Sequence, residues 1–305
     1  MKRPDHEDAS IAALMSAPLA EQATTISALG MPAAGLLILM SPCEQRCRFC
    51  AQQAVTHPPR SDWTPTDRID SLLRDNATLG LQRLCIGGTE PPTHPDFEHA
   101  LTRAHAAGFT DIELMTSATR LATPGLAKRW RAAGIQTIAA PIYSAQAEVH
   151  DDVTGGANHE RLLMGLDAAH AAGMHVRLHT LALNQNLAEI CTLAAMCAAR
   201  WGTRLTLAPA RPKTGVWDFD AEAPSLLSVS TALQDADPDQ ITLTGWPSCL
   251  CPELERDAAQ VITLYFMGQT RSFAQPCSDC SARSMCPGVV SALLDRDGTA
   301  SLTPQ

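Results

Sequence analysis

Five glycines divide the first two thirds of this chain into alternating helices and strands. Each follows a segment of helical periodicity and precedes a short apolar run: Gly80, Gly108, Gly134, Gly173 and Gly202. A helix that ends at glycine and gives way to a strand is typical of repeated strand–helix–strand units, whose crossovers are right-handed. Strands joined in this way run parallel, so the pattern predicts a parallel sheet covered by helices.

The apolar runs predict six strands and five intervening helices. The strands are expected near 34–41, 81–87, 110–116, 135–142, 174–182 and 203–208, and the helices near 65–79, 96–107, 124–133, 159–172 and 186–201. Six such units suit an open, incomplete version of the eight-stranded barrel, so the predicted fold is α/β, a partial (β/α)6 TIM-like barrel. We expect an N-terminal arm at 1–30, the barrel at 31–210 and a small C-terminal region at 211–305.

The fifth predicted strand carries polar side chains on one of its faces. Alternate residues of a strand face opposite sides, so Val176 and Leu178 are expected to pack outward against helices. The remaining side chains then point into the barrel: His175, Arg177 and His179. Three inward polar side chains suit a lumen that holds a ligand, and an edge strand with one wet face is the alternative.

Three cysteines follow the first predicted strand, at Cys43, Cys47 and Cys50. Structural zinc usually takes four protein ligands, whereas a cube of four irons held by three thiolates keeps one iron open for chemistry. A partial zinc site completed by His57 is the alternative. The loop follows a strand, and the active sites of parallel barrels form at the carboxyl ends of their strands.

A second motif, Gly87-Gly88-Thr89-Glu90-Pro91-Pro92, ends the second predicted strand. Together with the three-cysteine loop, it resembles the radical SAM superfamily over residues 31–210. The resemblance implies a [4Fe-4S] cluster held by Cys43, Cys47 and Cys50, with S-adenosylmethionine on its open iron. In that superfamily an electron, supplied here by a donor such as flavodoxin or ferredoxin, cleaves S-adenosylmethionine. The resulting 5′-deoxyadenosyl radical takes a hydrogen atom from the substrate.

The same resemblance gives further residues a role in binding S-adenosylmethionine. Gly87 and Gly88 let the backbone approach the ligand closely, because no Cβ intervenes. Glu90 suits the methionine ammonium, and Phe49 is expected in the surroundings of the adenine. The candidate contacts for ribose or carboxylate are Ser117, with an ordinary turn hydroxyl as the alternative, and Arg177.

A second group of cysteines lies near the C-terminus: Cys249, Cys251, Cys277, Cys280 and Cys286. Their pattern resembles the twitch and SPASM extensions, which follow the radical SAM barrel and bind auxiliary clusters. Five cysteines are too few for a full SPASM domain. We therefore expect a C-terminal auxiliary-cluster region with one additional [4Fe-4S] cluster, held by Cys249, Cys277, Cys280 and Cys286. Cys251 is the alternative to Cys249, and zinc is the alternative to iron.

Residues 141–155 follow the fourth predicted strand and resemble the same segment of radical enzymes that carry auxiliary clusters, some of which mature peptides. Tyr143 and His150 are candidate substrate contacts, and a His–Asp pair that caps the next helix is the alternative. The first hypothesis is oxidative modification of a peptide, presented by a separate recognition protein, or of a small metabolite. The alternatives are a radical cyclase or dehydratase on a nucleotide or sugar, with Arg211 and Lys213 at its anion, and a non-catalytic iron–sulfur scaffold or sensor.

Composition and charge argue against several other classes of function. The net charge of −9 disfavours a nucleic-acid groove. The N-terminus does not resemble a signal peptide, and the longest apolar run, 35–40, is too short to cross a bilayer. We therefore expect a cytoplasmic protein without a membrane partner, whose thiols stay reduced. Packing roles are expected for the isolated cysteines, Cys85, Cys191 and Cys197.

Overall fold

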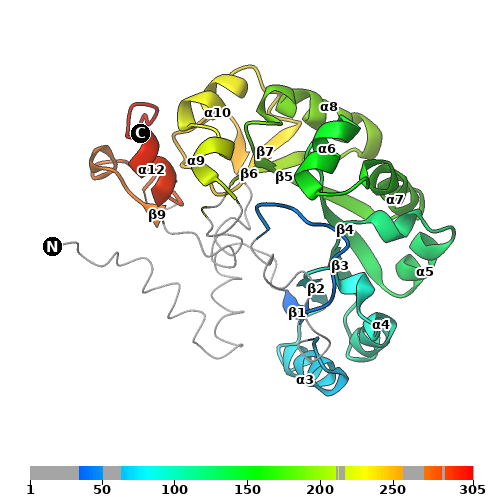
Figure 1. The fold of residues 1–305 in the computed structure, drawn as a ribbon. Coiled ribbons are helices and arrows are strands. Elements are labelled where there is room, and N and C mark those ends of the chain that lie inside the picture. Colours follow the sequence, from blue (N-terminus) through cyan, green and yellow to red (C-terminus); the bar gives the residue numbers. More distant parts are fainter. Residues whose placement is uncertain are drawn as a thin grey trace.

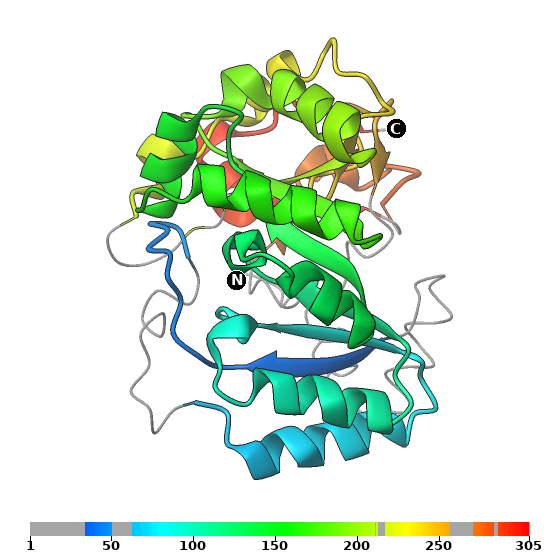
Figure 2. The same cartoon turned by 90° about the vertical axis from the view of Figure 1, so that its right-hand side faces the viewer.

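A computed structural model describes residues 34–50, 63–210, 212, 217–256, 271–283 and 286–304. Eight parallel strands form one sheet, in the order in which they follow one another along the chain. The sheet curves, and its helices lie around the outside (Figures 1 and 2). In the described residues the first and last strands do not pair with each other, so the barrel stays open.

The bounds of the elements are as follows. The sheet consists of β1 (Gly35–Leu39), β2 (Arg83–Gly88), β3 (Asp111–Met115), β4 (Ile135–Pro141), β5 (His175–Ala182), β6 (Leu205–Pro209), β7 (Ile241–Leu243) and β8 (Glu255–Arg256). The α-helices are α3 (Thr66–Ala77), α4 (Phe97–Ala106), α5 (Leu126–Ala132), α6 (Ala147–Thr154), α7 (His159–Ala171), α8 (Ile190–Trp201), α9 (Phe219–Glu222), α10 (Leu226–Ala232) and α12 (Ser291–Asp297). Short 3-10 helices are η3 (Pro91–Thr93), η4 (Thr119–Ala122), η5 (Leu187–Glu189) and η6 (Gln275–Cys277). A separate antiparallel ribbon pairs β9 (Arg271–Ser272) with β10 (Val289–Val290).

The prediction of an α/β partial barrel is confirmed. All six predicted strands and all five predicted helices are present, with ends that differ by a few residues. The five glycines at the helix ends have φ between 64° and 101°, the left-handed region that glycine reaches without a Cβ clash. The apolar runs did not predict α6, β7 or β8.

The sequence predicts that the barrel ends at residue 210, whereas in the structure β7 and β8 extend the same sheet beyond this residue. Beyond the sheet, the ribbon and α12 form a small C-terminal unit. Asp297 of α12 accepts a hydrogen bond of 2.8 Å from the backbone N–H of Leu226, and Arg296 donates one of 2.9 Å to the carbonyl of Ala223. The three-part domain division stays a prediction, and the arm expected at 1–30 lies outside the described residues.

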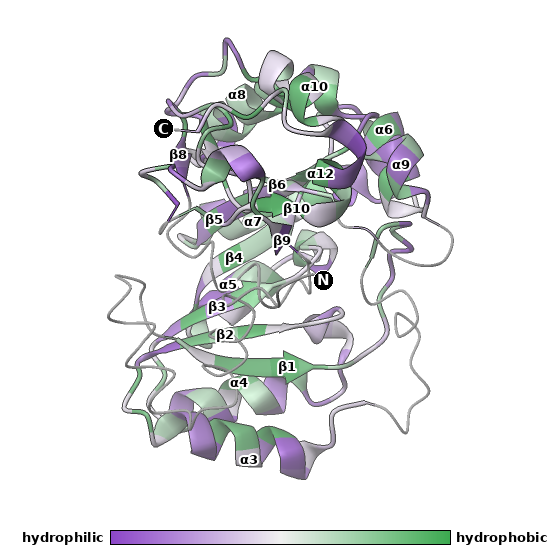
Figure 3. Cartoon of the chain, turned by 90° about the vertical axis from the view of Figure 1, so that its left-hand side faces the viewer, coloured by the Kyte–Doolittle hydropathy of each residue, from purple (hydrophilic) through white to green (hydrophobic). Residues whose placement is uncertain are grey.

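Apolar side chains fill the layer between the sheet and its helices. On β5, Val176 and Leu178 are buried there, as the alternation predicts, while His175 and Arg177 are exposed on the other face. α3 buries Ile69, Leu73 and Asn76, which recur at helical spacing, and its ribbon alternates between hydrophilic and hydrophobic stretches in Figure 3. No helix in the described ranges is long and apolar enough to cross a bilayer.

An ion-pair network joins three strands on the inner face of the sheet. The carboxylate of Glu113 on β3 is almost completely buried and lies 2.8 Å from the guanidinium of Arg83 on β2. Arg177 of β5 pairs with the same carboxylate. β4 lies between β3 and β5, and the register partner of Arg177 there is the small residue Ala139. Arg177 can therefore reach over β4 to Glu113.

The outer edge of β1 is covered by side chains from the chain segment that follows it. The amide of Asn76 on α3 accepts a bond of 2.9 Å from the N–H of Leu36 and donates one of 3.2 Å to its carbonyl. Thr64 bonds the N–H of Met40 at 2.9 Å and the carbonyl of Ile38 at 3.3 Å. These contacts satisfy backbone groups that an edge strand would otherwise expose.

Replacing Asn76 by alanine is expected to lower the free energy of unfolding by about 1–3 kcal/mol, because it leaves the N–H and C=O of Leu36 without these partners. Urea unfolding of the purified protein, compared with the parent, measures the change. Asp75→Ala, at an exposed position one residue earlier on the same helix, is the matched control and is expected to unfold like the parent. Equal stabilities of the Asn76 variant and the parent would contradict the assigned role.

Candidate active site

The loop that carries Cys43, Cys47 and Cys50 begins at the carboxyl end of β1. Cys47 is buried, and the other two cysteines are half-buried. Burial raises the pKa of Cys43 to about 11, with further increases from Glu90 and Cys50 nearby. Burial likewise raises the pKa of Cys47 far above its ordinary value. Both thiols therefore stay protonated at neutral pH unless a metal displaces the proton.

Residues that follow β4 hold this loop in place. The N–H of Arg46 donates a hydrogen bond of 2.8 Å to the carbonyl of Thr154. A Cβ on Gly155 would stand 2.9 Å from the carbonyl oxygen of Arg46, and its φ of 70° also requires glycine. The buried amide of Gln45 donates to Asn158 at 3.2 Å. The segment around α6 is therefore part of the support of the cysteine loop.

The second motif stands beside the end of β1. Gly88 has a φ of 138°, and a Cβ at this position would lie 2.0 Å from the carbonyl oxygen of Leu39. Only glycine permits this approach of the two strands. Just beyond, the hydroxyl of Ser41 donates a bond of 2.8 Å to the backbone carbonyl of Glu90. The two motifs are thereby fixed to each other.

The side chain of Glu90 is buried and its carboxylate points to the end of β3. One oxygen accepts from the hydroxyl of Thr116, and the other accepts from the N–H of Ser117 at 2.8 Å. Burial raises the pKa of Glu90, against the lowering effect of these two bonds. A cation brought to the carboxylate would favour its charged form. The site thus offers a preformed acceptor for an ammonium group.

Ser117 lies with Glu90, whereas Arg177 has a different partner. The hydroxyl of Ser117 is 3.0 Å from that of Thr119 and almost completely buried. Arg177 pairs with Glu113 on the inner face of the sheet. The structure therefore brings four predicted residues together at the ends of β2 and β3: Gly87, Gly88, Glu90 and Ser117. Arg177 is not among them, because it pairs with the carboxylate of Glu113.

Aromatic rings surround Phe49, between the second and third loop cysteines. The ring centroid of Phe49 is 5.1 Å from that of Tyr143 and 5.9 Å from that of Trp217, both in edge-on geometry. Tyr143 and Trp217 are themselves buried. Trp217 was not predicted as part of this site, because no residue next to it in the sequence indicates that the chain after β6 returns to the cysteine loop.

His150 is fully buried and both of its ring nitrogens are hydrogen-bonded. Nδ1 accepts from the N–H of Tyr143 at 3.2 Å, and Nε2 is 3.1 Å from Oδ1 of Asn158. Burial lowers the pKa of His150 to about 4, so the ring is neutral at pH 7. Asp151 accepts from the N–H groups of Asn158 and His159 at 2.9 and 2.8 Å, which caps α7. The geometry thus matches the helix-capping alternative, and His150 does not face an open space.

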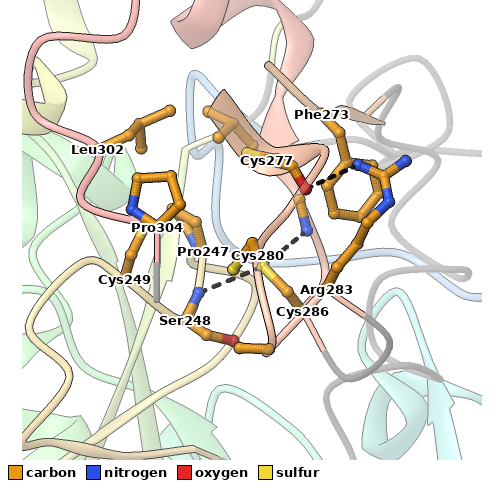
Figure 4. A pocket seen from close by; sticks show the side chains of 13 residues that line it. Pro247, Ser248, Cys249, Phe273, Cys277, Cys280, Arg283, Cys286, Leu302 and Pro304 are labelled. Carbon is orange, nitrogen blue, oxygen red and sulfur yellow. Dashed lines mark hydrogen bonds between the residues drawn. The ribbon is translucent and has the colours of Figure 1, made fainter. Parts of the chain in front are cut away.

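Four C-terminal cysteines line one pocket, shown in Figure 4: Cys249, Cys277, Cys280 and Cys286. Cys251 is not among the lining residues. It is buried, has a left-handed φ of 51°, and interacts with Arg256 and Ser230. Within the described ranges no three His, Cys, Asp or Glu side chains already surround a single metal position, so the fit of either cysteine group to iron rests on its donor set. Four thiols in one pocket match the four ligands of an iron–sulfur cube.

Three residues named from the sequence lie outside the described residues: His57, Arg211 and Lys213. The isolated cysteines are placed by the structure. Cys197 is fully buried in the core, and Cys191 is half-buried against it. Cys85 is on the inner face of β2, with Glu113 as its register partner, and burial raises its pKa to about 12.

Comparisons with known proteins agree with this geometry. A GTP 3′,8-cyclase of Paracoccus denitrificans is 26% identical over 272 residues, which cover 85% of this chain and 76% of that relative. An AdoMet-dependent heme synthase of Methanosarcina barkeri is 32% identical over 154 residues, 50% of this chain and less than half (43%) of the relative. Among solved structures, Streptococcus suis SuiB bound to S-adenosylmethionine has the same fold, with a TM-score of 0.57 at 14% identity over 92% of this chain and 79% of that one.

The radical SAM superfamily matches residues 37–197, more than half of the chain and the part that carries both motifs. Enzymes of this superfamily bind a [4Fe-4S] cluster and S-adenosylmethionine. The match, the open parallel barrel and the cysteine loop at the end of β1 lead to one conclusion: this chain belongs to the radical SAM superfamily of enzymes.

Proposed function

We propose that this enzyme carries out an oxidative modification of its substrate, with a second [4Fe-4S] cluster in the C-terminal pocket as the electron acceptor. The observation that carries the proposal is the set of four cysteines that line one pocket. Four thiolates occupy all four irons of a cube, so no iron is left open to bind a substrate. A saturated cluster is suited to electron transfer.

The residues around the cysteine loop prepare the first site. Cys43, Cys47 and Cys50 hold the radical cluster, and Glu90 accepts the ammonium of S-adenosylmethionine. The half-buried ring of Phe49 packs against the buried rings of Tyr143 and Trp217, and together they shield this side of the loop from water. When bound, the cluster and S-adenosylmethionine supply a radical that abstracts hydrogen atoms.

The proposed reaction is a two-electron oxidation of the substrate. The substrate gives one hydrogen atom to the 5′-deoxyadenosyl radical, which becomes 5′-deoxyadenosine. The substrate radical would then lose one electron to the second cluster, held by Cys249, Cys277, Cys280 and Cys286, and one proton as the new bond forms. An external one-electron carrier such as ferredoxin or flavodoxin supplies the electron that cleaves S-adenosylmethionine, and an oxidised carrier accepts the electron from the second cluster.

A small metabolite is the preferred substrate class. The two relatives are named for GTP and for heme, and both of these are small molecules. A peptide is the second choice within the same reaction class, and it would be presented by a separate recognition protein.

A radical cyclase on a nucleotide is a second candidate function. The similarity to GTP 3′,8-cyclase over 85% of this chain favours it. In that case the second cluster would ligate the substrate, which requires an open iron and therefore only three of the four pocket cysteines. A scaffold or sensor without catalysis is disfavoured, because such a protein has no need for the buried Glu90 acceptor and its two hydrogen bonds.

Glu90→Gln is expected to weaken the binding of S-adenosylmethionine by about tenfold to a hundredfold, because a hydrogen bond to a charged group contributes about 1.5–3 kcal/mol. Anaerobic calorimetric titration of the reconstituted protein measures the dissociation constant. Glu44→Gln removes a nearby but exposed carboxylate, and we expect no change. The assignment of Glu90 fails if both variants bind as the parent does.

Cys249→Ala is expected to lower the iron content from about eight to about four per chain, because it removes one of the four ligands of the second cube. Cys251→Ala is the matched control, two residues away and outside the pocket, and is expected to keep about eight. Iron and sulfide analysis after anaerobic reconstitution measures both. Loss of iron in the Cys251 variant alone would assign the fourth ligand to Cys251 instead.

A further inference from the structure

Arg256, at the end of β8, is built into the loop that carries Cys249. Its guanidinium donates to the backbone carbonyls of Leu250 at 2.6 Å and Leu254 at 2.8 Å, and also to those of Pro247, Ser248 and Cys251. Its Nε–H is buried and has no acceptor in the described part of the chain. The carbonyls are neutral, so they fix the position of the guanidinium without adding a negative charge, and the carboxylate of Glu253 also acts on it electrostatically.

Arg271, on β9, also lies near this cysteine group. It donates to the carbonyl of Gly288 at 3.1 Å, just after Cys286. Burial lowers the pKa of Arg271 to about 10, which still leaves it charged at neutral pH. Both arginines interact electrostatically with Cys286, and Arg256 also interacts with Cys249.

The sulfur of Cys286 also accepts two backbone hydrogen bonds. The N–H of Ser248 is 3.3 Å from it and that of Gly288 is 3.4 Å from it. Hydrogen bonds to cysteine sulfur, together with net charge and exposure to solvent, set the reduction potential of an iron–sulfur cluster. A cluster held by Cys286 would therefore have two N–H dipoles on that sulfur and two guanidinium groups near it that do not themselves line the pocket, and its negative charge would grow on reduction.

We propose that Arg256 and Arg271 raise the reduction potential of the cluster in this pocket and so make it an electron acceptor. The inference rests on the proposed function, since it requires a second cluster. Electrostatic effects are larger in a buried, low-dielectric region than in water, so two partly buried guanidinium groups have more effect than exposed ones. These arginines touch no substrate, and they act only through the cluster.

The test uses the full-length chain with Cys43, Cys47 and Cys50 replaced by alanine, so that only the second cluster is present. Its midpoint potential is measured by redox titration followed by electron paramagnetic resonance. Arg256→Gln and Arg271→Gln are each expected to lower the potential by about 59 mV, which corresponds to a tenfold change in the equilibrium constant of a one-electron couple. Arg256→Lys and Arg271→Lys keep the charge and are expected to stay close to the parent. Arg283→Gln, at an exposed residue that lines the same pocket, is the control and is expected to cause a smaller shift.

The possible outcomes separate the inference from the proposed function. If the three-cysteine variant binds no iron, the proposed second cluster fails. If it binds iron but the glutamine variants have the parent's potential, or shift no more than Arg283→Gln, the inference is overturned and the proposed function remains. If both glutamine variants lose iron while the lysine variants keep it, the charge serves cluster assembly and the inference is likewise overturned.

Discussion

The close contact between the ends of β1 and β2 is the constraint on which the rest of the site depends. Gly88 approaches the carbonyl of Leu39 so closely that no side chain fits between them. This contact sets the cysteine loop, which continues β1, beside Glu90, which continues β2. Because parallel strands all end at the same edge of the sheet, Ser117 at the end of β3 joins them and donates to the Glu90 carboxylate. The cysteine loop and the Glu90 carboxylate are therefore held next to each other by backbone contacts.

A buried network of hydrogen bonds also supports the cysteine loop. His150 and Asn158 connect the end of β4 to Gln45 in the cysteine loop, and Asp151 caps α7 in the same stretch. A neutral, fully bonded histidine contributes order here without a protonation step. His150 and Asp151, which look catalytic in the sequence, are thus engaged in hydrogen bonds that support the cysteine loop and cap α7.

Much of the fold was predictable from the sequence. The glycines at helix ends and the apolar runs give β1 to β6 and the helices between them, because these elements are long and strongly periodic. β8 was missed because it consists of two charged residues, Glu255 and Arg256, which carry no apolar signal. α6 was not predicted, because it is short and carries no apolar run, and its end is fixed by contacts of Thr154 and Gly155 with Arg46 of the cysteine loop.

The candidate site was predictable where a motif lies at a strand end, and not where distant segments meet. The spacing of the cysteines could not distinguish Cys249 from Cys251, whereas in the structure Cys249 lines the pocket and Cys251, with its left-handed backbone, does not. Arg177 was expected near S-adenosylmethionine, and its pairing with Glu113 depends on β3 and β5 facing one lumen. Trp217 and the arginines around the pocket likewise belong to tertiary contacts that no local pattern encodes.

We propose that the chain holds two iron–sulfur clusters in two separate cysteine groups. The most direct measurement is Mössbauer spectroscopy with iron, sulfide and zinc analysis on anaerobically reconstituted protein, for the parent and for the variant with Cys43, Cys47 and Cys50 changed to alanine. We expect about eight irons in the parent and about four in the variant, with the spectrum of a [4Fe-4S] cluster in both. If the parent holds about four irons and the variant none, and both retain zinc, the chain has a single radical cluster beside a structural zinc site, and the proposal of two clusters is wrong.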